Sequence, residues 1–227
     1  MIELSKYNSL IFDCDGVILN SNKIKTNAFR KVLKQYQQKA VDEFIKYHLS
    51  NGGISRYEKF KFFINTILPK FEAIELNKKN FLRELLDNYS KESKSALFNC
   101  EVTKKLNILR NHTEKIPWLI VSGGDQKELI EVFKHKQIYD LFNGGIFGSP
   151  DKKNEIIQRE IINGKIKFPA LMFGDSKLDY IVAKSNKIDF LFVTTWTDFK
   201  EYKAYCFEND ISTVEFVSDI LKIEDLH

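Results

Sequence analysis

The first apolar run of the chain ends in two aspartates that are one residue apart. Residues 10–12 are apolar, Asp13 and Asp15 follow, and Gly16 comes directly after them. Alternate residues of a strand project to the same face, so both carboxylates leave the strand end toward one point, while Cys14 faces the buried side. Two like charges this close are unfavourable unless a cation or a shared proton offsets them. The pair therefore predicts a functional site at the end of a buried strand.

A second acidic cluster follows another apolar run far along the chain. Asp175 and Asp179 come shortly after the largely apolar residues 168–173. Mg²⁺ prefers oxygen ligands, which carboxylates supply. Two strand ends that deliver carboxylates from distant parts of the sequence predict one Mg²⁺ site.

The order of apolar and amphipathic segments indicates an α/β fold. Short apolar runs alternate with segments of helical spacing, which is typical of an open, Rossmann-like parallel sheet. Ligands bind beyond the carboxyl ends of the strands in such sheets, and the polar clusters lie at those ends. The expected strands are residues 8–13, 117–121, 145–147, 170–173 and 190–194, with residues 214–217 as a candidate edge strand.

Residues 20–90 show only helical spacing. Asn51-Gly52-Gly53 interrupts the pattern, Ser55 is a candidate cap for the next helix, and Pro69 closes that helix. A further helix is expected over residues 80–89. The sequence therefore predicts a small all-helical insert directly after the first strand.

Composition limits the partners and the location of the protein. The 227 residues are 43% hydrophobic and 29% charged, as in a globular protein with a sizeable core. The 35 basic and 31 acidic residues leave a net charge of +4, which is too balanced to indicate a nucleic-acid partner. Three cysteines without a CxxC pair imply neither a disulfide framework nor a zinc site. No apolar run reaches about 18 residues, so we expect no membrane span, no export and a cytoplasmic location.

Four segments together resemble the motifs of the haloacid dehalogenase-like hydrolase superfamily. They occur in the expected order and strand-end context: Asp13-Cys14-Asp15-Gly16-Val17, Ser122, a lysine after the third strand, and Gly174-Asp175-Ser176-Lys177-Leu178-Asp179. The helical insert resembles the subgroup with an α-helical cap, which includes phosphoglycolate phosphatases and β-phosphoglucomutases. This resemblance divides the chain into a core of residues 1–18 and 92–227 and a cap of residues 19–91.

The resemblance also implies roles for the acidic residues. Asp13 matches the nucleophile that attacks a phosphate monoester and becomes an aspartyl-phosphate, and Asp15 matches the general acid and base. The implied Mg²⁺ ligands are Asp13, Asp175 and the backbone carbonyl of Asp15, with Asp179 binding the metal directly or orienting its waters.

Phosphate contacts are expected from two further segments. Ser122, with the backbone amides of Gly123 and Gly124, can hold phosphate oxygens where a strand leads into a helix. Lys152 and Lys153 both qualify by position as the cation that neutralises the phosphoenzyme. The spacing from Gly148-Ser149-Pro150 resembles the third motif of the family more closely for Lys153.

The cap is expected to select the substrate. Gly53, Ser55 and Arg56 resemble the Gly-x-Ser-Arg loop of sugar-phosphate mutases and phosphatases with this cap, in which the arginine reaches a distal anionic or hydroxyl group. Arginine suits a planar anion contact. Lys59 and His48 are further candidates for substrate contact.

These inferences predict a Mg²⁺-dependent phosphatase that hydrolyses a small phosphate monoester, such as a sugar phosphate, through an aspartyl-phosphate. A phosphomutase of the β-phosphoglucomutase type has the same motif residues and is the alternative enzyme. A catalytically inactive binding protein with this fold is the alternative of another class. The expected partner is a small phosphorylated metabolite, and hinges between cap and core are expected near residues 18–22 and 90–96.

Overall fold

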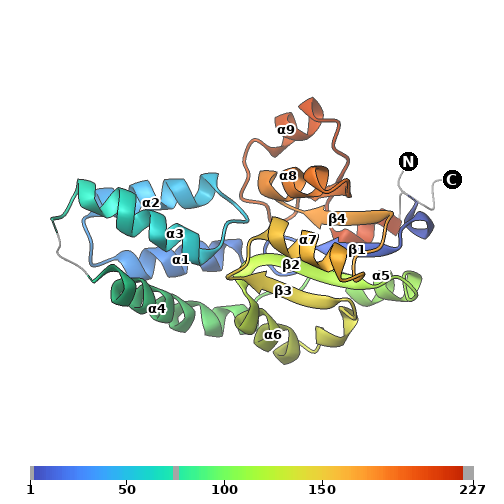
Figure 1. Cartoon of the computed structure of the whole chain (residues 1–227), viewed down its shortest axis with the longest axis horizontal. Coiled ribbons are helices and arrows are strands. Elements are labelled where there is room, and N and C mark those ends of the chain that lie inside the picture. The colour runs from blue at the N-terminus through green and yellow to red at the C-terminus, as the bar shows by residue number, and fades with distance from the viewer. Residues whose placement is uncertain (1–2, 74–76, 222–227) are drawn as a thin grey trace.

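In the computed structural model, which describes residues 3–73 and 77–221, six parallel strands form one sheet (Figure 1). The remaining residues, 1–2, 74–76 and 222–227, belong to the expected domain ranges but lie outside the described part. The strands lie in the order β3-β2-β1-β4-β5-β6, so β1 is an inner strand between β2 and β4. Their bounds are β1 Ser9–Phe12, β2 Trp118–Asp125, β3 Gly145–Ser149, β4 Ala170–Gly174, β5 Asp189–Val193 and β6 Thr213–Val214. The expected parallel sheet is confirmed.

Helices cover both faces of this sheet, because successive strand residues alternate between two apolar clusters. Leu10 and Phe12 pack into the cluster that contains residues of α5 and α6, whereas Ile11 packs into the cluster that contains residues of α7 and α8. Burial on both faces explains why residues 10–12 are all apolar. The core helices are α5 Leu106–His112, α6 Gln126–His135, α7 Lys153–Ile162, α8 Lys177–Ser185 and α9 Tyr202–Glu208.

The register of the inner strands brings their carboxyl ends to one level. Phe12, the last residue of β1, pairs with Ile120 of β2 and Phe173 of β4. The backbone N–H of Asp13 donates to the carbonyl of Phe173 at 2.9 Å. Residues that follow β1 and β4 therefore meet at the same edge of the sheet.

The first four α-helices after β1 pack around an apolar cluster of their own. This cluster contains Phe29, Phe44, Phe60 and Tyr89 and is separate from the two clusters of the sheet. Figure 1 shows these helices gathered beside the sheet rather than on either of its faces. Their bounds are α1 Asn22–Leu33, α2 Gln38–Ser50, α3 Arg56–Phe62 and α4 Lys78–Asn99. The expected helical cap is confirmed.

Helix α4 is longer than the residues 80–89 that the sequence predicts. It continues to Asn99 without a break, so the expected domain boundary after residue 91 and the expected hinge at 90–96 fall inside one helix. Residues 90–96 are largely polar, which hides the helical pattern, but Tyr89, Ser93 and Leu97 form a buried stripe. Tyr89 packs in the apolar cluster of the cap, whereas Leu97 packs in an apolar cluster of the sheet. The domain ranges and the hinges remain predictions.

The last part of the core differs most from expectation. The candidate edge strand at 214–217 is only partly correct, because β6 ends at Val214 and residues Val217–Asp219 form a 3₁₀ turn. Helix α9 was not expected from the sequence. Among the described residues, no helix combines the length and apolar character that crossing a membrane requires.

Candidate active site

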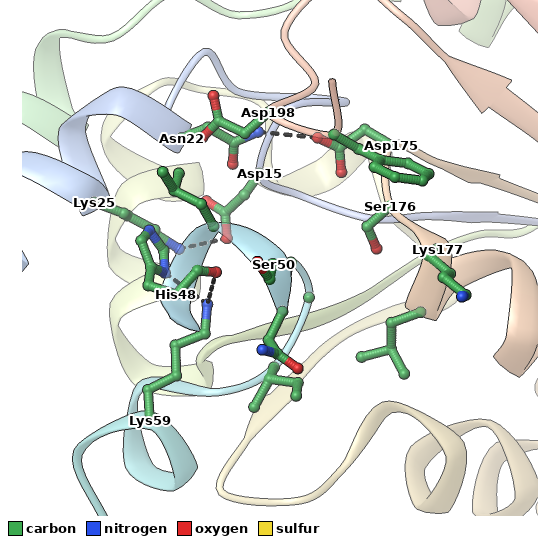
Figure 2. A pocket seen from close by; sticks show the side chains of 18 of the residues that line it. Asp15, Asn22, Lys25, His48, Ser50, Lys59, Asp175, Ser176, Lys177 and Asp198 are labelled. Atoms are coloured by element: carbon green, nitrogen blue, oxygen red, sulfur yellow. Dashed lines mark hydrogen bonds and ion pairs between the residues drawn. The ribbon is translucent and has the colours of Figure 1, made fainter. Parts of the chain in front are cut away.

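A cavity of about 760 Å³ lies between the cap and the carboxyl ends of the strands (Figure 2). Its core side includes Asp13, Asp15 and Asp175, and its cap side includes Lys25 and Lys59. Figure 2 shows Lys25, His48 and Lys59 on one side of the pocket and Asp175 and Ser176 on the other. The core thus supplies these carboxylates, and the cap supplies these lysines, to the same cavity.

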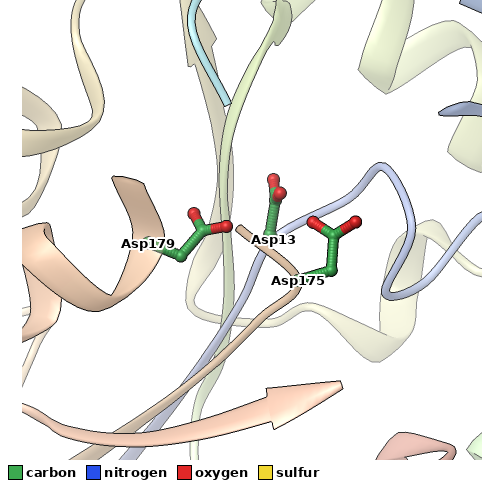
Figure 3. A group of neighbouring side chains, drawn as sticks. All are labelled: Asp13, Asp175 and Asp179. Carbon is green, nitrogen blue, oxygen red and sulfur yellow. The ribbon is translucent and has the colours of Figure 1, made fainter. Parts of the chain in front are cut away.

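Three buried carboxylates converge at the end of the sheet (Figure 3). Asp13 follows β1, Asp175 follows β4, and Asp179 lies in the first turn of α8, where it also accepts a hydrogen bond from the Ser176 hydroxyl at 2.5 Å. One oxygen of each carboxylate lies within 4.8 Å of the others. The sequence predicts these three residues in one site, and the structure brings them together.

The electrostatics of this group fit a divalent cation. Burial, together with the charges of Asp179 and Asp15, raises the pKa of Asp13 to about 7 against the opposing effect of Lys153. Burial and the neighbouring carboxylates also raise the pKa of Asp175 well above its ordinary value. The chain alone therefore supplies too little positive charge for three carboxylates. Oxygen donors at this spacing suit Mg²⁺.

Glycine at position 16 is required by this arrangement. Its φ is +79°, in the left-handed region, and a Cβ there would lie 2.1 Å from Oδ2 of Asp175. The same Asp175 oxygen accepts a hydrogen bond from the Asn22 side-chain amide at 2.9 Å. The turn after β1 and the start of α1 therefore both hold Asp175 in place.

Lys153, rather than Lys152, lies beside the nucleophile candidate. Lys153 is buried, with Nζ 2.9 Å from Oδ1 of Asp13 and 2.5 Å from Oδ1 of Asp179. Although burial opposes it, the two carboxylates raise the pKa of Lys153. Lys152 is exposed and immediately precedes α7. Lys153 is therefore a fixed cation at the site.

Asp15 has its own cationic partner, which the sequence did not indicate. Its Oδ2 lies 2.5 Å from Nζ of Lys25 in α1, and its Oδ1 accepts from the Ser21 hydroxyl at 2.6 Å. Burial would raise the pKa of Asp15, but Lys25 and Ser21 outweigh it and hold that pKa below its ordinary range. Asn22 and Lys25 lie three residues apart on one helix face, which is the only signal in the sequence that could have found them.

The segment after β2 differs in detail from the expected phosphate loop. Strand β2 continues through Ser122 to Asp125, and Asp125 caps α6 by accepting from Glu128 N at 3.0 Å. Ser122 is fully buried, and its Oγ accepts from the amide of Gly124 at 3.0 Å. That amide is therefore already bonded, whereas Gly123 lines the cavity.

The cap loop docks directly on this segment. A Cβ at Gly123 would lie 2.3 Å from the carbonyl oxygen of Gly53, so the two backbones touch only because residue 123 is a glycine. Gly53 itself has a φ of +80°. The Ser55 hydroxyl caps α3 by accepting from Glu58 N at 3.3 Å. Gly53 thus forms part of the cavity wall, and Ser55 caps the N-terminus of α3.

Arg56 lines the cavity, but its charge is paired across the cap–core boundary. Its two terminal nitrogens contact the carboxylate of Glu128 at 2.5 and 3.1 Å, and one of them also donates to Ser90 Oγ at 3.0 Å. The guanidinium lies 4.8 Å from the centre of the Tyr89 ring. Substrate contact by Arg56 therefore remains a prediction, and the structure adds a cap–core ion pair that the sequence did not reveal.

A family model described as haloacid dehalogenase-like hydrolase matches residues 10–193. A curated protein of Drosophila melanogaster, named "Probable pseudouridine-5'-phosphatase", is 25% identical over 164 residues, which cover 71% of this chain and 63% of that protein. The chain thus spans less than two thirds of the length of this relative.

Two solved structures share the fold over nearly the whole chain. A structure described as "a predicted phosphoglycolate phosphatase" from Haemophilus somnus has a TM-score of 0.73 at 16% identity and covers 96% of this chain and 98% of its own. A haloacid dehalogenase-like family hydrolase from Streptococcus pneumoniae has a TM-score of 0.67 at 19% identity, with 96% and 99% covered.

The family match includes the strands that carry the acidic cluster, and the sequence resemblance rests on those same strand ends. Fold, motif order and family model agree over the sheet and over the helical insert. The chain belongs to the haloacid dehalogenase-like hydrolase family.

Proposed function

We propose that the protein is a Mg²⁺-dependent phosphatase that hydrolyses a small phosphate monoester through an aspartyl-phosphate on Asp13. The observation that carries this proposal is the position of Asp13, which shares buried space with Asp175 and Asp179 and contacts Lys153. The names of the Drosophila melanogaster and Haemophilus somnus relatives, both phosphatases, support the same reaction class. The proposed partner is a small phosphorylated metabolite.

Asp13 is suited to the nucleophilic role by its fixed orientation. Its Oδ1 accepts from the Cys14 amide at 2.7 Å and contacts Lys153. In the first half-reaction an oxygen of Asp13 forms a bond to phosphorus while the bond from phosphorus to the alcohol oxygen breaks. In the second half-reaction water attacks the phosphorus, which releases inorganic phosphate and restores the Asp13 carboxylate.

Asp15 is suited to move the proton in both half-reactions. It gives a proton to the leaving alcohol oxygen and later takes one from the attacking water. In the substrate-free protein Lys25 holds Asp15 as a carboxylate, so Asp15 has to gain a proton before the first half-reaction.

Asp13, Asp175 and Asp179, with the backbone carbonyl of Asp15, would hold the Mg²⁺. Bound Mg²⁺ would offset the repulsion between the aspartates and an incoming phosphate. Lys153 remains paired with Asp13 and Asp179 and adds a second positive charge near the transferred group. Gly123 lines the same cavity from β2, and the buried Ser122 precedes it and holds the Gly124 amide.

The test is release of p-nitrophenol from p-nitrophenyl phosphate with Mg²⁺, with EDTA, and with the Asp13→Asn variant. Activity that requires Mg²⁺ and disappears in the variant supports the proposal. A covalent phosphate detected by mass spectrometry on an acid-quenched Asp15→Asn variant would identify the intermediate, because that variant keeps the nucleophile but loses the proton carrier.

Two other outcomes would replace this proposal. Conversion of a sugar monophosphate that requires a bisphosphorylated activator would indicate the phosphomutase. Calorimetric binding of Mg²⁺ and inorganic phosphate without turnover of any ester would indicate an inactive binding protein with this fold.

A further inference from the structure

Four buried or largely buried cations surround the site, and one of them lacks a carboxylate partner. Lys153 pairs with Asp13 and Asp179, Lys25 pairs with Asp15, and Arg56 pairs with Glu128. Lys59 is only 4% exposed, yet no carboxylate of residues 3–73 or 77–221 lies within ion-pair distance of its Nζ. A buried charge without a counter-charge is unfavourable, so this position needs an explanation.

The contacts of Lys59 hold its ammonium in place without neutralising it. Nζ lies 2.7 Å from Nδ1 of His48, and Nε2 of His48 lies 2.8 Å from the Thr26 hydroxyl. That hydroxyl donates to the carbonyl of Asn22 at 3.1 Å, so it accepts from His48. His48 therefore carries its proton on Nε2, and its bare Nδ1 accepts from Lys59. Lys59 also donates to the backbone carbonyl of His48 at 3.5 Å, so both of these acceptors are neutral.

The charge state of the pair agrees with this geometry. Burial and the positive charge of Lys59 lower the pKa of His48 to about 2, so His48 stays neutral. Burial and the nearby Lys25 lower the pKa of Lys59 to about 7. An anion beside Lys59 would reverse that effect and keep the ammonium charged.

Lys59 faces the same space as the reacting groups. It belongs to α3, one turn after Arg56, and it lines the cavity together with Asp13 and Asp15. In Figure 2 its side chain ends beside His48, on the cap side of the pocket and opposite Asp175. With a phosphate at Asp13, Lys59 is therefore one of the groups that border the space left for the alcohol portion of the ester.

We propose that Lys59 binds a second anionic group, a carboxylate or a second phosphate, on the alcohol portion of the substrate. The preferred substrates are then phosphate monoesters of acidic alcohols. This inference rests on the proposed phosphatase function and adds the substrate class. Arg56 is less suited to the task, because Glu128 already balances its charge. His48 and Thr26 act as positioning residues that aim Lys59.

Matched substrates test the proposal directly. 3-Phosphoglycerate and glycerol 3-phosphate differ in a carboxylate against a hydroxymethyl group, and propane-1,3-diol bisphosphate and its monophosphate differ in the second phosphate. In the wild-type protein we expect kcat/KM to favour the acidic member of at least one pair by about 10- to 100-fold, the effect of one charged hydrogen bond. The pair with the larger ratio identifies the second anion.

The Lys59→Met variant should remove that preference. We expect the ratio of kcat/KM values to fall about 10- to 100-fold, mainly through KM. A ratio within a pair cancels any general loss of activity. The Lys46→Met variant removes the same charge from an exposed lysine that also lines the cavity, and its ratio should stay within about twofold of wild type.

Each possible result bears on the proposal. A wild-type protein without preference for the acidic member of either pair, or a Lys59→Met variant that keeps the wild-type ratio, would overturn it. If no ester is hydrolysed at all, the phosphatase function fails separately. Calorimetric binding of 3-phosphoglycerate against glycerol 3-phosphate to the wild-type and Lys59→Met proteins then tests Lys59: a preference that the variant loses supports it, and equal binding overturns it.

Discussion

Two buried lysines border the candidate active site from opposite sides, and their surroundings differ. Lys153, on the core side, contacts Asp13 and Asp179, which raise its pKa despite burial. Lys59, on the cap side, contacts neutral His48, and its pKa is lowered to about 7. The core lysine is charged whether or not a ligand is present, whereas the charge of the cap lysine depends on what lies beside it.

Under the proposed function, this difference separates two tasks of the site. The phosphate group is common to every substrate of a phosphatase, so the core can be fully prepared for it. The alcohol portion varies, so the cap carries the group whose counter-charge the substrate supplies. Variants on the core side should therefore change the reaction with every ester, and variants at Lys59 should change the preference among esters.

The largest effect should come from Asp13→Asn. Removal of the nucleophile should reduce phosphate release at least about a thousandfold with every ester, because no group in the site can take over the covalent step. Steady-state rates with p-nitrophenyl phosphate measure it. The melting temperature should not fall, since the change removes one of three crowded carboxylates; a strongly destabilised variant would mean that Asp13 mainly supports the fold.

Lys153→Met should be the most destabilising of the lysine variants. It leaves Asp13 and Asp179 buried without their cation, which costs about 3–5 kcal/mol of the free energy of unfolding. Urea denaturation in EDTA measures this change without added metal. Lys152→Met is the matched control. Because Lys152 is exposed, this variant should change the free energy of unfolding by no more than about 0.5 kcal/mol. An equal decrease in the free energy of unfolding in the two variants would contradict the pairing of Lys153 with Asp13 and Asp179.

The ion pair between Arg56 and Glu128 tests whether cap docking and substrate binding are separate. In a double-mutant cycle of Arg56→Met and Glu128→Gln, we expect a coupling of about 1–3 kcal/mol in the free energy of unfolding, because the pair is largely buried. Both single variants should change KM alike if the pair only docks the cap. A rise in KM for acidic substrates in Arg56→Met alone would show that Arg56 also binds substrate.

The sequence predicted which core residues lie together better than it predicted the contacts of the cap residues. Asp13, Asp175 and Asp179 could be grouped in advance because each follows an apolar run and parallel strands align their carboxyl ends. The partners of Lys25 and Glu128 could not be predicted, because each contacts a residue across the boundary between cap and core. The helical spacing of Asn22 and Lys25 could at most have suggested that these two side chains share a face, and it does not say how the cap lies on the core.

The same limit applies to secondary structure. The end of α4 was missed because the polar residues after Tyr89 carry only a narrow buried stripe, which becomes visible once the helix packs against both cap and core. Most strands, by contrast, were located to within a few residues, since strands buried on both faces are continuous apolar runs.

The smallest effect, and the sharpest test of the contrast between the lysines, is the pH dependence of substrate preference. The lowered pKa of about 7 means that Lys59 is charged below that pH and neutral above it. The preference for an acidic ester over its neutral match should therefore fall roughly tenfold between pH 6 and pH 8, as the protonated fraction does. The ratio of kcat/KM values at each pH measures it.

The other groups near Lys59 determine how this titration is interpreted. Lys25 and Lys153 lower its pKa further, whereas Asp15 and Asp198 raise it, and His48 is neutral across the range. Their effects on the reaction itself are common to both esters and cancel in the ratio. The pH dependence of kcat/KM reports the free protein, so the fall should occur there. A bound acidic ester raises the pKa of Lys59, so in kcat the fall should occur at higher pH or not at all. A ratio that stays constant from pH 6 to pH 8 would mean that Lys59 keeps its charge without a ligand, as Lys153 does.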